Sequence, residues 1–456
     1  MVKTGRWLRV ARRTGWGISD SAFSSLTNFA LGVTVARSLG PRDLGAFGLA
    51  FATYVIGLSI EQTMASQPLL VRYSGVESHA FKDAARSASG TALTTGVLTG
   101  GICLVIGWAS SGALSQAFIV LGVCLPGLLV QDSLRMIFFA SRRGQHALIN
   151  DVIWALVMFP ALFILLSSGR GSVFWLTLAW GGAANVAAVI GMLQAGLVPH
   201  PSRTAGWVRE HRDIAPRFLA EMMALTGTRQ LSQYGIAVSS GLLAVGAIRA
   251  AQLLLNALQI LSQGIGLVAL PEAVRIGRTS VRPLKTMVWV ICAALVATTF
   301  VWGIVLVLLP SSLGRAILGL SWHAAKDLFV PLTLVQAAGG AISAAVIGLR
   351  ALVAVRRSLR ARLLVSLLQV AGAIGGAAAD GARGAAWGLA IAGWVGAVVF
   401  WRQFNRAFDE RLRSELTERE LAPIWMRQTR SGVTEHMDGW RREVADADSD
   451  PRLLGT

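Results

Sequence analysis

Long apolar runs constrain the fold of this 456-residue chain more than any other feature of its sequence. A helix needs roughly 20 apolar residues to cross a bilayer, and an α-helix satisfies its own backbone hydrogen bonds there. We therefore predict an all-α polytopic membrane protein with about 12 transmembrane helices. The predicted spans lie near residues 16–38, 44–71, 91–110, 114–139, 148–166, 173–197, 218–240, 242–270, 287–309, 328–349, 363–379 and 385–401.

The composition agrees with a membrane protein. Hydrophobic residues make up 54% of the chain and charged residues 14%, whereas soluble domains carry about 25% charged residues. The basic start MVKTGRWLRVARRTGWG leads into a full-length span, so we expect no cleavable signal peptide. Cys103, Cys124 and Cys292 fall inside apolar runs and offer neither a disulfide framework nor a metal spacing.

Basic loop residues fix the expected orientation. The loops on the side of the N-terminus hold 23 Lys and Arg residues, and the loops on the other side hold 6. The positive-inside rule then places both termini in the cytoplasm of a multi-pass plasma-membrane protein. Because the net charge of +18 reflects this loop excess, we predict contact with the lipid bilayer and no nucleic-acid partner.

A weak internal repeat relates the two halves of the chain. LGAFGLA at residues 44–50 matches VGAIRAA at residues 245–251, and Asn28-Phe29 matches Gln233-Tyr234 in character. Six helices per half is an even number, so the halves have parallel orientation about an axis along the membrane normal. We predict two six-helix bundles, related by this parallel pseudo-repeat, around a central cavity.

The expected domain organisation follows from these spans. It comprises a basic cytoplasmic N-terminus (1–14), an N-terminal six-helix bundle (15–199), a cytoplasmic linker (200–217), a C-terminal six-helix bundle (218–402) and a cytoplasmic charged tail, partly disordered (403–456).

Polar side chains within the spans mark the candidate site. A charge at the bilayer centre costs about 2.5–3.5 kcal/mol on insertion scales, so such residues are candidates for function. The eighth span carries a polar face at helical spacing, which we interpret as a cavity lining. The predicted substrate-binding residues are Arg229, Arg249, Gln252, Asn256, Gln259, Gln233, Asn28 and Asp20.

A structural interpretation of these residues stays open. Buried amide side chains can form hydrogen bonds between membrane helices, and each such bond stabilises the fold by only about 0.6 kcal/mol on average. Arg229 would then pair with Glu221, and Arg249 with backbone carbonyls. Asp132 and Arg135, one turn apart near the cytoplasmic surface, are interpreted as a structural pair.

Enzyme signatures are absent from the sequence. The chain contains no Walker loop, and no two of its six histidines have metal-ligand spacing. We therefore predict a protein that is not an enzyme, with no catalytic residues, no metal and no cofactor.

Several stretches resemble the polysaccharide flippase branch of the multidrug/oligosaccharidyl-lipid/polysaccharide exporter superfamily. VARSLGPRDLGAFGLAFA is similar to its first hairpin, and AVGAIRAAQLLLNALQILSQGIGLVALPEAVR is similar to its eighth-helix region. QDSLRMIFFASRRGQHALINDVIWALV resembles the connection between its fourth and fifth helices, and LGLSWHAAKDLFVPLTL its tenth-helix entry. The resemblance covers about residues 15 to 402.

The resemblance implies transport of a saccharide linked to a polyprenyl diphosphate, by alternating access, for cell-surface polysaccharide biosynthesis. It also implies polysaccharide polymerases and glycosyltransferases as partners. The chain departs from the lipid II flippase subfamily, which usually has fourteen helices. An ion-coupled drug or small-molecule antiporter of the same superfamily is the alternative. A major facilitator transporter is disfavoured because the loop RYSGVESHAFKDAARSAS lacks that family's signature.

Overall fold

The computed structural model describes residues 2–74, 78–222, 226–258, 269, 272–277 and 281–421. Within these ranges the chain is helical and contains no strand. The N-terminal half contains α1 (Val2–Ser38), α2 (Pro41–Glu61), α3 (Gln67–Tyr73), α4 (Ser78–Ala109), α5 (Gly112–Ala140), α6 (Gly144–Ser167) and α7 (Val173–Ala195). A 3-10 turn (Pro201–Arg203), α8 (Thr204–Glu210) and α9 (Ala215–Met222) connect it to the C-terminal half.

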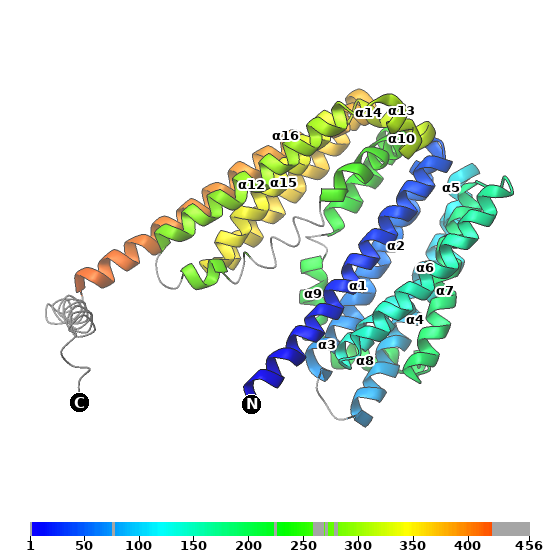
Figure 1. The fold of residues 1–456 in the computed structure, drawn as a ribbon, viewed down its shortest axis with the longest axis horizontal. Helices are drawn as coiled ribbons and strands as arrows, with labels where there is room; N and C mark the ends of the chain where they lie inside the picture. The colour runs from blue at the N-terminus through cyan, green and yellow to red at the C-terminus, as the bar shows by residue number, and fades with distance from the viewer. Residues whose placement is uncertain are drawn as a thin grey trace, which may run out of the picture.

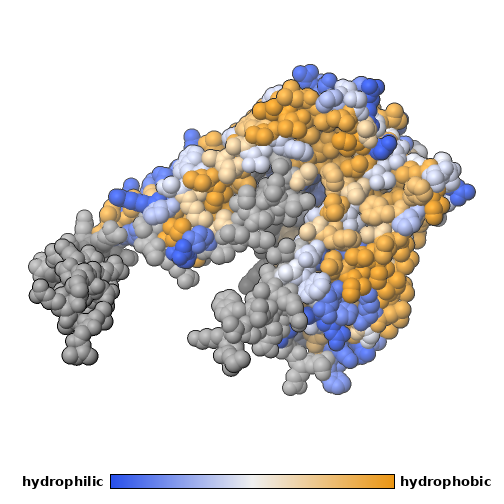
Figure 2. Space-filling view, viewed as in Figure 1, coloured by the Kyte–Doolittle hydropathy of each residue, from blue (hydrophilic) through white to orange (hydrophobic). Residues whose placement is uncertain are grey.

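The C-terminal half contains the remaining helices. They are α10 (Thr228–Leu255), a 3-10 turn (Asn256–Leu258), α12 (Val281–Val307), α13 (Ser311–Leu318), a 3-10 turn (Gly319–Ser321), α14 (Trp322–Lys326), α15 (Phe329–Ala351) and α16 (Val355–Leu421). Figure 1 shows the two halves as separate helical bundles, which meet at one end of the molecule and diverge toward the end where α1 begins and α16 ends. Figure 2 shows hydrophobic residues over the outer surface of both halves. The predicted two-bundle, all-α architecture is confirmed.

The described helices follow the predicted spans. Nine helical segments of the described residues are long and apolar enough to cross a membrane. Two of them reverse direction internally, α10 at Gly241 with φ 76° and α16 at Asp380–Gly381. Each reversal falls between two predicted spans, and parts of the spans predicted at 218–240 and 242–270 lie outside the described residues. Several helices exceed their predicted spans, since α1 begins at Val2, α4 begins at Ser78 and α16 continues to Leu421.

The linker between the halves is attached to the N-terminal bundle. Pro68, near the start of α3, has no backbone N–H. It therefore cannot donate to the carbonyl of Met64, which lies one turn earlier, in the π-helical turn Gln62–Ser66. The indole nitrogen of Trp207 in α8 donates to that carbonyl over 2.9 Å. Arg72 at the end of α3 donates to Asp213 over 2.6 Å, so the π-helical turn and α3 hold the linker at two points.

The two halves meet most closely where α2 crosses the second segment of α10. A Cβ atom on Gly45 would overlap the carbonyl of Leu242, and one on Gly246 would overlap the carbonyl of Pro41. Gly45 and Gly246 occupy the same place in the predicted repeat, so the contact is reciprocal. Nearby, the hydroxyl of Ser321 donates to the carbonyl of Leu39 over 3.2 Å. The halves are therefore in close contact at the end opposite the termini.

Candidate functional site: a central cavity between the halves

A cavity of about 460 Å³ lies between the two halves. Its N-terminal wall comes from α1 and α2, and its C-terminal wall comes from α10 and the residues that flank it. The lining residues are Asn28, Leu31, Gly32, Val35, Ala36, Leu44, Phe47, Phe51, Val55, Thr226, Arg229, Gln230, Gln233, Arg249, Gln252, Leu253 and Asn256. One wall is thus largely apolar, and the other is cationic and rich in amides.

Both arginines singled out in the sequence line this cavity. Arg229 lies in the first segment of α10 and Arg249 in the second, on opposite sides of the reversal at Gly241. At 1.5 Å per residue they lie about 18 Å and 12 Å from that reversal, so they are staggered in depth. The described part of the lining contains no Asp or Glu, and neither arginine has an ion pair with any described residue. The guanidinium of Arg249 lies 4.5 Å from the centre of the Phe51 ring.

Amide side chains extend the polar wall into the C-terminal half. Gln233, Gln252 and Asn256 line both the central cavity and an adjoining space of about 200 Å³. This side space adds Gln336 from α15 and Gln369 from α16. Gln336 donates to Asn256 over 3.3 Å, while the buried Oε1 of Gln233 has no hydrogen-bond partner among the described residues.

The remaining predicted site residues have different outcomes. Asn28 lines the cavity, and its amide also donates to the carbonyl of Ser24 over 2.9 Å. Gln259 lies outside the described residues, and the structure does not describe the Glu221 side chain. The placement of Asp20 in the cavity is wrong, because its side chain is 0% exposed and is bound to Arg135.

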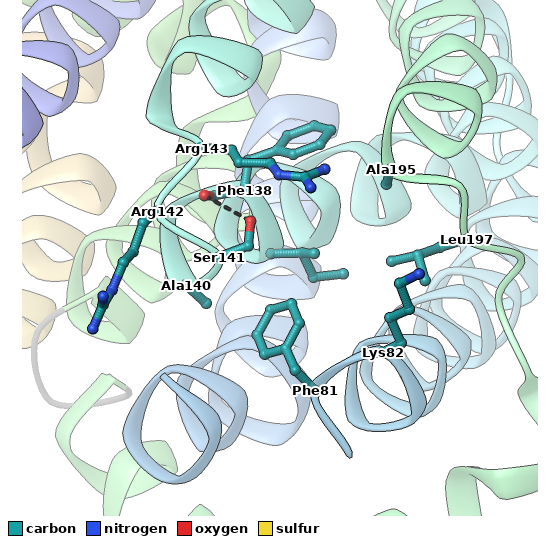
Figure 3. Close-up of a pocket in the computed structure, with 10 residues that line it drawn as sticks. Phe81, Lys82, Phe138, Ala140, Ser141, Arg142, Arg143, Ala195 and Leu197 are labelled. Carbon is teal, nitrogen blue, oxygen red and sulfur yellow. Dashed lines mark hydrogen bonds between the residues drawn. The ribbon is translucent and has the colours of Figure 1, made fainter. Parts of the chain in front are cut away.

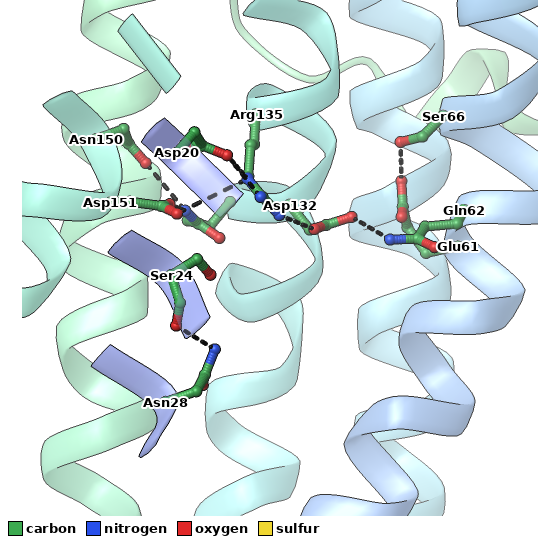
Figure 4. Close-up of polar contacts among 11 residues, drawn as sticks. Asp20, Ser24, Asn28, Glu61, Gln62, Ser66, Asp132, Arg135, Asn150 and Asp151 are labelled. Carbon is green, nitrogen blue, oxygen red and sulfur yellow. Dashed lines mark hydrogen bonds and ion pairs between the residues drawn. The ribbon is translucent and has the colours of Figure 1, made fainter. Parts of the chain in front are cut away.

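Asp20 belongs to a buried charged network within the N-terminal half (Figure 4). Arg135 donates to Asp20 from Nη2 over 2.6 Å and from Nε over 2.9 Å. Asp132 and Asp151 lie 3.8 and 3.7 Å from the same guanidinium. The predicted local pair of Asp132 and Arg135 is therefore only one part of a cluster that joins α1, α5 and α6.

The network continues into α2 through a π-helical turn. Gln62 donates to Asp132 over 3.0 Å, and Ser66 donates to the buried Glu61 over 2.6 Å. Three buried carboxylates, Asp20, Asp132 and Asp151, thus share one arginine, and a fourth, Glu61, is buried nearby without an ion pair to any described residue. Such an excess of negative charge is unfavourable away from water unless protons or cations neutralise it. No set of three or more His, Cys, Asp or Glu side chains in the described ranges is arranged to hold a metal ion.

Sequence comparisons identify no relative. No protein-family model matches the chain, and no curated protein matches it. The fold, in contrast, is shared with solved structures. One is an inward-facing multidrug resistance MATE family transporter of the MOP superfamily, with a TM-score of 0.67 and 14% identity over 86% of this chain and 96% of the other.

Two further structures extend the likeness. The lipid II flippase MurJ in an inward closed conformation gives a TM-score of 0.60 and 14% identity, over 87% of this chain and 90% of MurJ. A MOP superfamily transporter from Pyrococcus furiosus gives a TM-score of 0.50 and 15% identity, over 88% and 96%. The chain therefore has the fold of MOP superfamily transporters.

Proposed function

We propose that this protein is a flippase that moves a saccharide linked to a polyprenyl diphosphate across the plasma membrane. The observation that carries this proposal is the pair of cavity arginines, neither of which has a carboxylate partner among the residues that the structure describes. A guanidinium in a region of low dielectric needs a counter-charge, and here the protein supplies none within the lining. A diphosphate would supply it, because guanidinium groups offer paired donors that match phosphate oxygens.

The two walls of the cavity fit the two ends of such a substrate. The staggered depths of Arg229 and Arg249 let the diphosphate pass from one guanidinium to the other. Amides are good partners for sugar hydroxyls, and Gln252, Asn256 and Gln369 supply them on the C-terminal side. Leu31, Val35 and Phe47 on the opposite wall suit an isoprenoid chain.

Transport is proposed to occur by alternating access of the two halves. The glycine contact between Gly45 and Gly246 closes the end opposite the termini, while the halves diverge at the other end (Figure 1). With both termini in the cytoplasm, this conformation admits substrate from the cytoplasmic leaflet. The opposite state requires that the glycine contact separate. The supporting pathway then includes glycosyltransferases that build the saccharide and a polymerase that consumes it.

Ion-coupled antiport of a small molecule is the second candidate function. The buried network around Arg135 favours it, because an excess of buried carboxylates can bind and release protons or cations. The two candidates differ in their cargo, and the two cavity arginines, which have no ion pair with a described residue, favour an anionic one.

Complementation of a flippase-deficient strain tests the proposal. Arg229→Gln and Arg249→Gln should insert normally and fail to restore surface polysaccharide. Arg383→Gln is the matched control, since Arg383 is exposed and lies outside the cavity. Full complementation by both cavity variants, at wild-type protein levels, would exclude the arginines as the diphosphate site.

A further inference from the structure

A separate pocket of about 340 Å³ opens at the end of the N-terminal half that carries the N-terminus (Figure 3). It lies between the beginning of α4, the turn that joins α5 to α6, and the end of α7. The lining residues are Phe81, Lys82, Ile137, Phe138, Ala140, Ser141, Arg142, Arg143, Ala195 and Leu197. None of them lines the central cavity, so an inference about this α4–α5–α7 pocket does not rest on the proposed transport function.

The pocket combines cations with an apolar floor. Lys82, Arg142 and Arg143 are exposed, and none of the three has an ion pair with any residue that the structure describes. Among the described residues, the lining includes no Asp or Glu. Lys82 and Arg143 extend into the pocket from α4 and from the α5–α6 turn, whereas Arg142 points to the side (Figure 3). Ile137 and Leu197 are buried beneath them.

The backbone of the α5–α6 turn holds Arg142 in a conformation that normally favours glycine. Its φ is 64°, and the N–H groups of Arg142 and Arg143 donate to the carbonyls of Phe139 and Phe138 over 3.0 and 2.8 Å. This hydrogen-bond pattern caps a helix C-terminus and usually takes glycine at the left-handed position. An arginine in this conformation carries a conformational cost.

The C-terminal half contains the same turn without the arginines. Val353 has a φ of 58°, and Val353 and Ala354 donate to Arg350 and Leu349 over 3.0 and 2.9 Å after α15. Arg142 and Val353 are the only described non-glycine residues with positive φ. Because the turn forms equally with Val353 and Ala354, its geometry does not require Arg142 and Arg143. Arg142 and Arg143 both line the pocket of the N-terminal half.

We propose that the α4–α5–α7 pocket binds the headgroup of an anionic glycerophospholipid. The phosphate would lie between Lys82 and Arg143, and basic pockets between membrane helices suit such headgroups. The acyl chains would follow the outer face of α7, where Leu193 is 77% exposed. This continuity with a lipid-facing apolar surface favours a lipid over a soluble anion.

Native mass spectrometry of the purified full-length protein tests this assignment. The protein is incubated with equimolar phosphatidylglycerol and phosphatidylcholine of identical acyl chains, and the two adducts are compared. Wild type should retain phosphatidylglycerol preferentially. Each cation near a membrane surface contributes roughly fivefold in affinity, so Lys82→Gln/Arg143→Gln should reduce the preference by at least about tenfold. Arg402→Gln/Arg406→Gln removes the same charge from exposed positions on α16 and should leave the preference unchanged.

Two results would overturn the proposal. One is an equal preference for phosphatidylglycerol in wild type and in the pocket variant. The other is loss of the phosphatidylglycerol adduct when inorganic phosphate is added at millimolar concentration, which would indicate a site for a soluble anion. Should the double variant fold poorly, Lys82→Gln alone provides the same comparison, with an expected loss of about fivefold.

Discussion

Gly45 and Gly246 pack against each other across the boundary between the two halves, with no room for a Cβ atom on either residue. The contact is reciprocal, because Gly45 meets Leu242 as Gly246 meets Pro41. Two equivalent surfaces that meet in this way are isologous, as at a two-fold axis. The internal repeat thus places its axis through the contact that closes one end of the cavity.

Substitution of these glycines should open the closed end. Gly45→Ala or Gly246→Ala places a methyl group into a backbone carbonyl, and overpacking of this kind costs about 1–3 kcal/mol. We expect spin labels on α2 and α10 near this contact to report increased separation, together with reduced transport. Gly101→Ala and Gly339→Ala are controls, because a Cβ atom there meets nothing within 4 Å. An unchanged separation in Gly246→Ala would contradict a closure that depends on this contact.

The buried network predicts an asymmetry between its two main partners. Arg135→Gln leaves three buried carboxylates without their cation, and breaking a buried ion pair in this way costs about 3–5 kcal/mol. Asp20→Asn should cost less, since Arg135 keeps Asp132 and Asp151. Thermal unfolding in detergent measures both. The double variant should be more stable than Arg135→Gln alone, and a lower stability of the double variant would count against this charge balance.

Conservative substitution separates charge from geometry in the cavity. Arg249→Lys keeps the positive charge but loses the planar fork that binds phosphate through two donors and stacks on Phe51. We expect Arg249→Lys to transport more slowly than wild type and faster than Arg249→Gln. Initial rates in membrane vesicles provide the measurement. If the lysine variant matches the glutamine variant, charge alone contributes little at this position.

The membrane orientation remains a prediction from the basic loops. In a background without Cys103, Cys124 and Cys292, single cysteines at Ser168 and Ser414 should react oppositely with an impermeant thiol reagent. Both positions are exposed, and they lie at opposite ends of the bundles. Labelling of Ser168→Cys from outside intact cells, without labelling of Ser414→Cys, is the expected result. The reverse pattern would invert the proposed direction of transport.

The sequence predicted the spans well because each span depends on a local property, a run of apolar residues. Even the sharp reversals in α10 and α16 were anticipated as loops, since glycine at residues 241 and 381 permits a positive φ. The predicted helix ends were less accurate, because α1 and α4 begin before their apolar runs. Polar residues at the ends of α1 and α4 sustain the helix as well as apolar ones do.

The site was only partly predictable, since it depends on contacts between distant segments. The polar stripe of α10 identified Arg249, Gln252 and Asn256 because helical spacing places them on one face. The same spacing placed Asp20 with Asn28, although Arg135, 115 residues away, binds the carboxylate. Gln336 and Gln369 are isolated polar residues in apolar runs. Only the packing of α15 and α16 on α10 brings them to the side space that adjoins the central cavity.

Flipping by the purified protein in liposomes tests the central claim most directly. A fluorescent polyprenyl diphosphate saccharide is incorporated into the liposomes, and an impermeant quencher is added outside. The loss of fluorescence then measures how much of the probe reaches the outer leaflet. With wild type and Arg383→Gln, probe from both leaflets should be quenched because it flips to the outside. With Arg229→Gln/Arg249→Gln, the probe in the inner leaflet should stay there and remain fluorescent. Equal quenching with wild type and the double cavity variant, or no flipping by wild type, would contradict the account of the cavity as a diphosphate pathway.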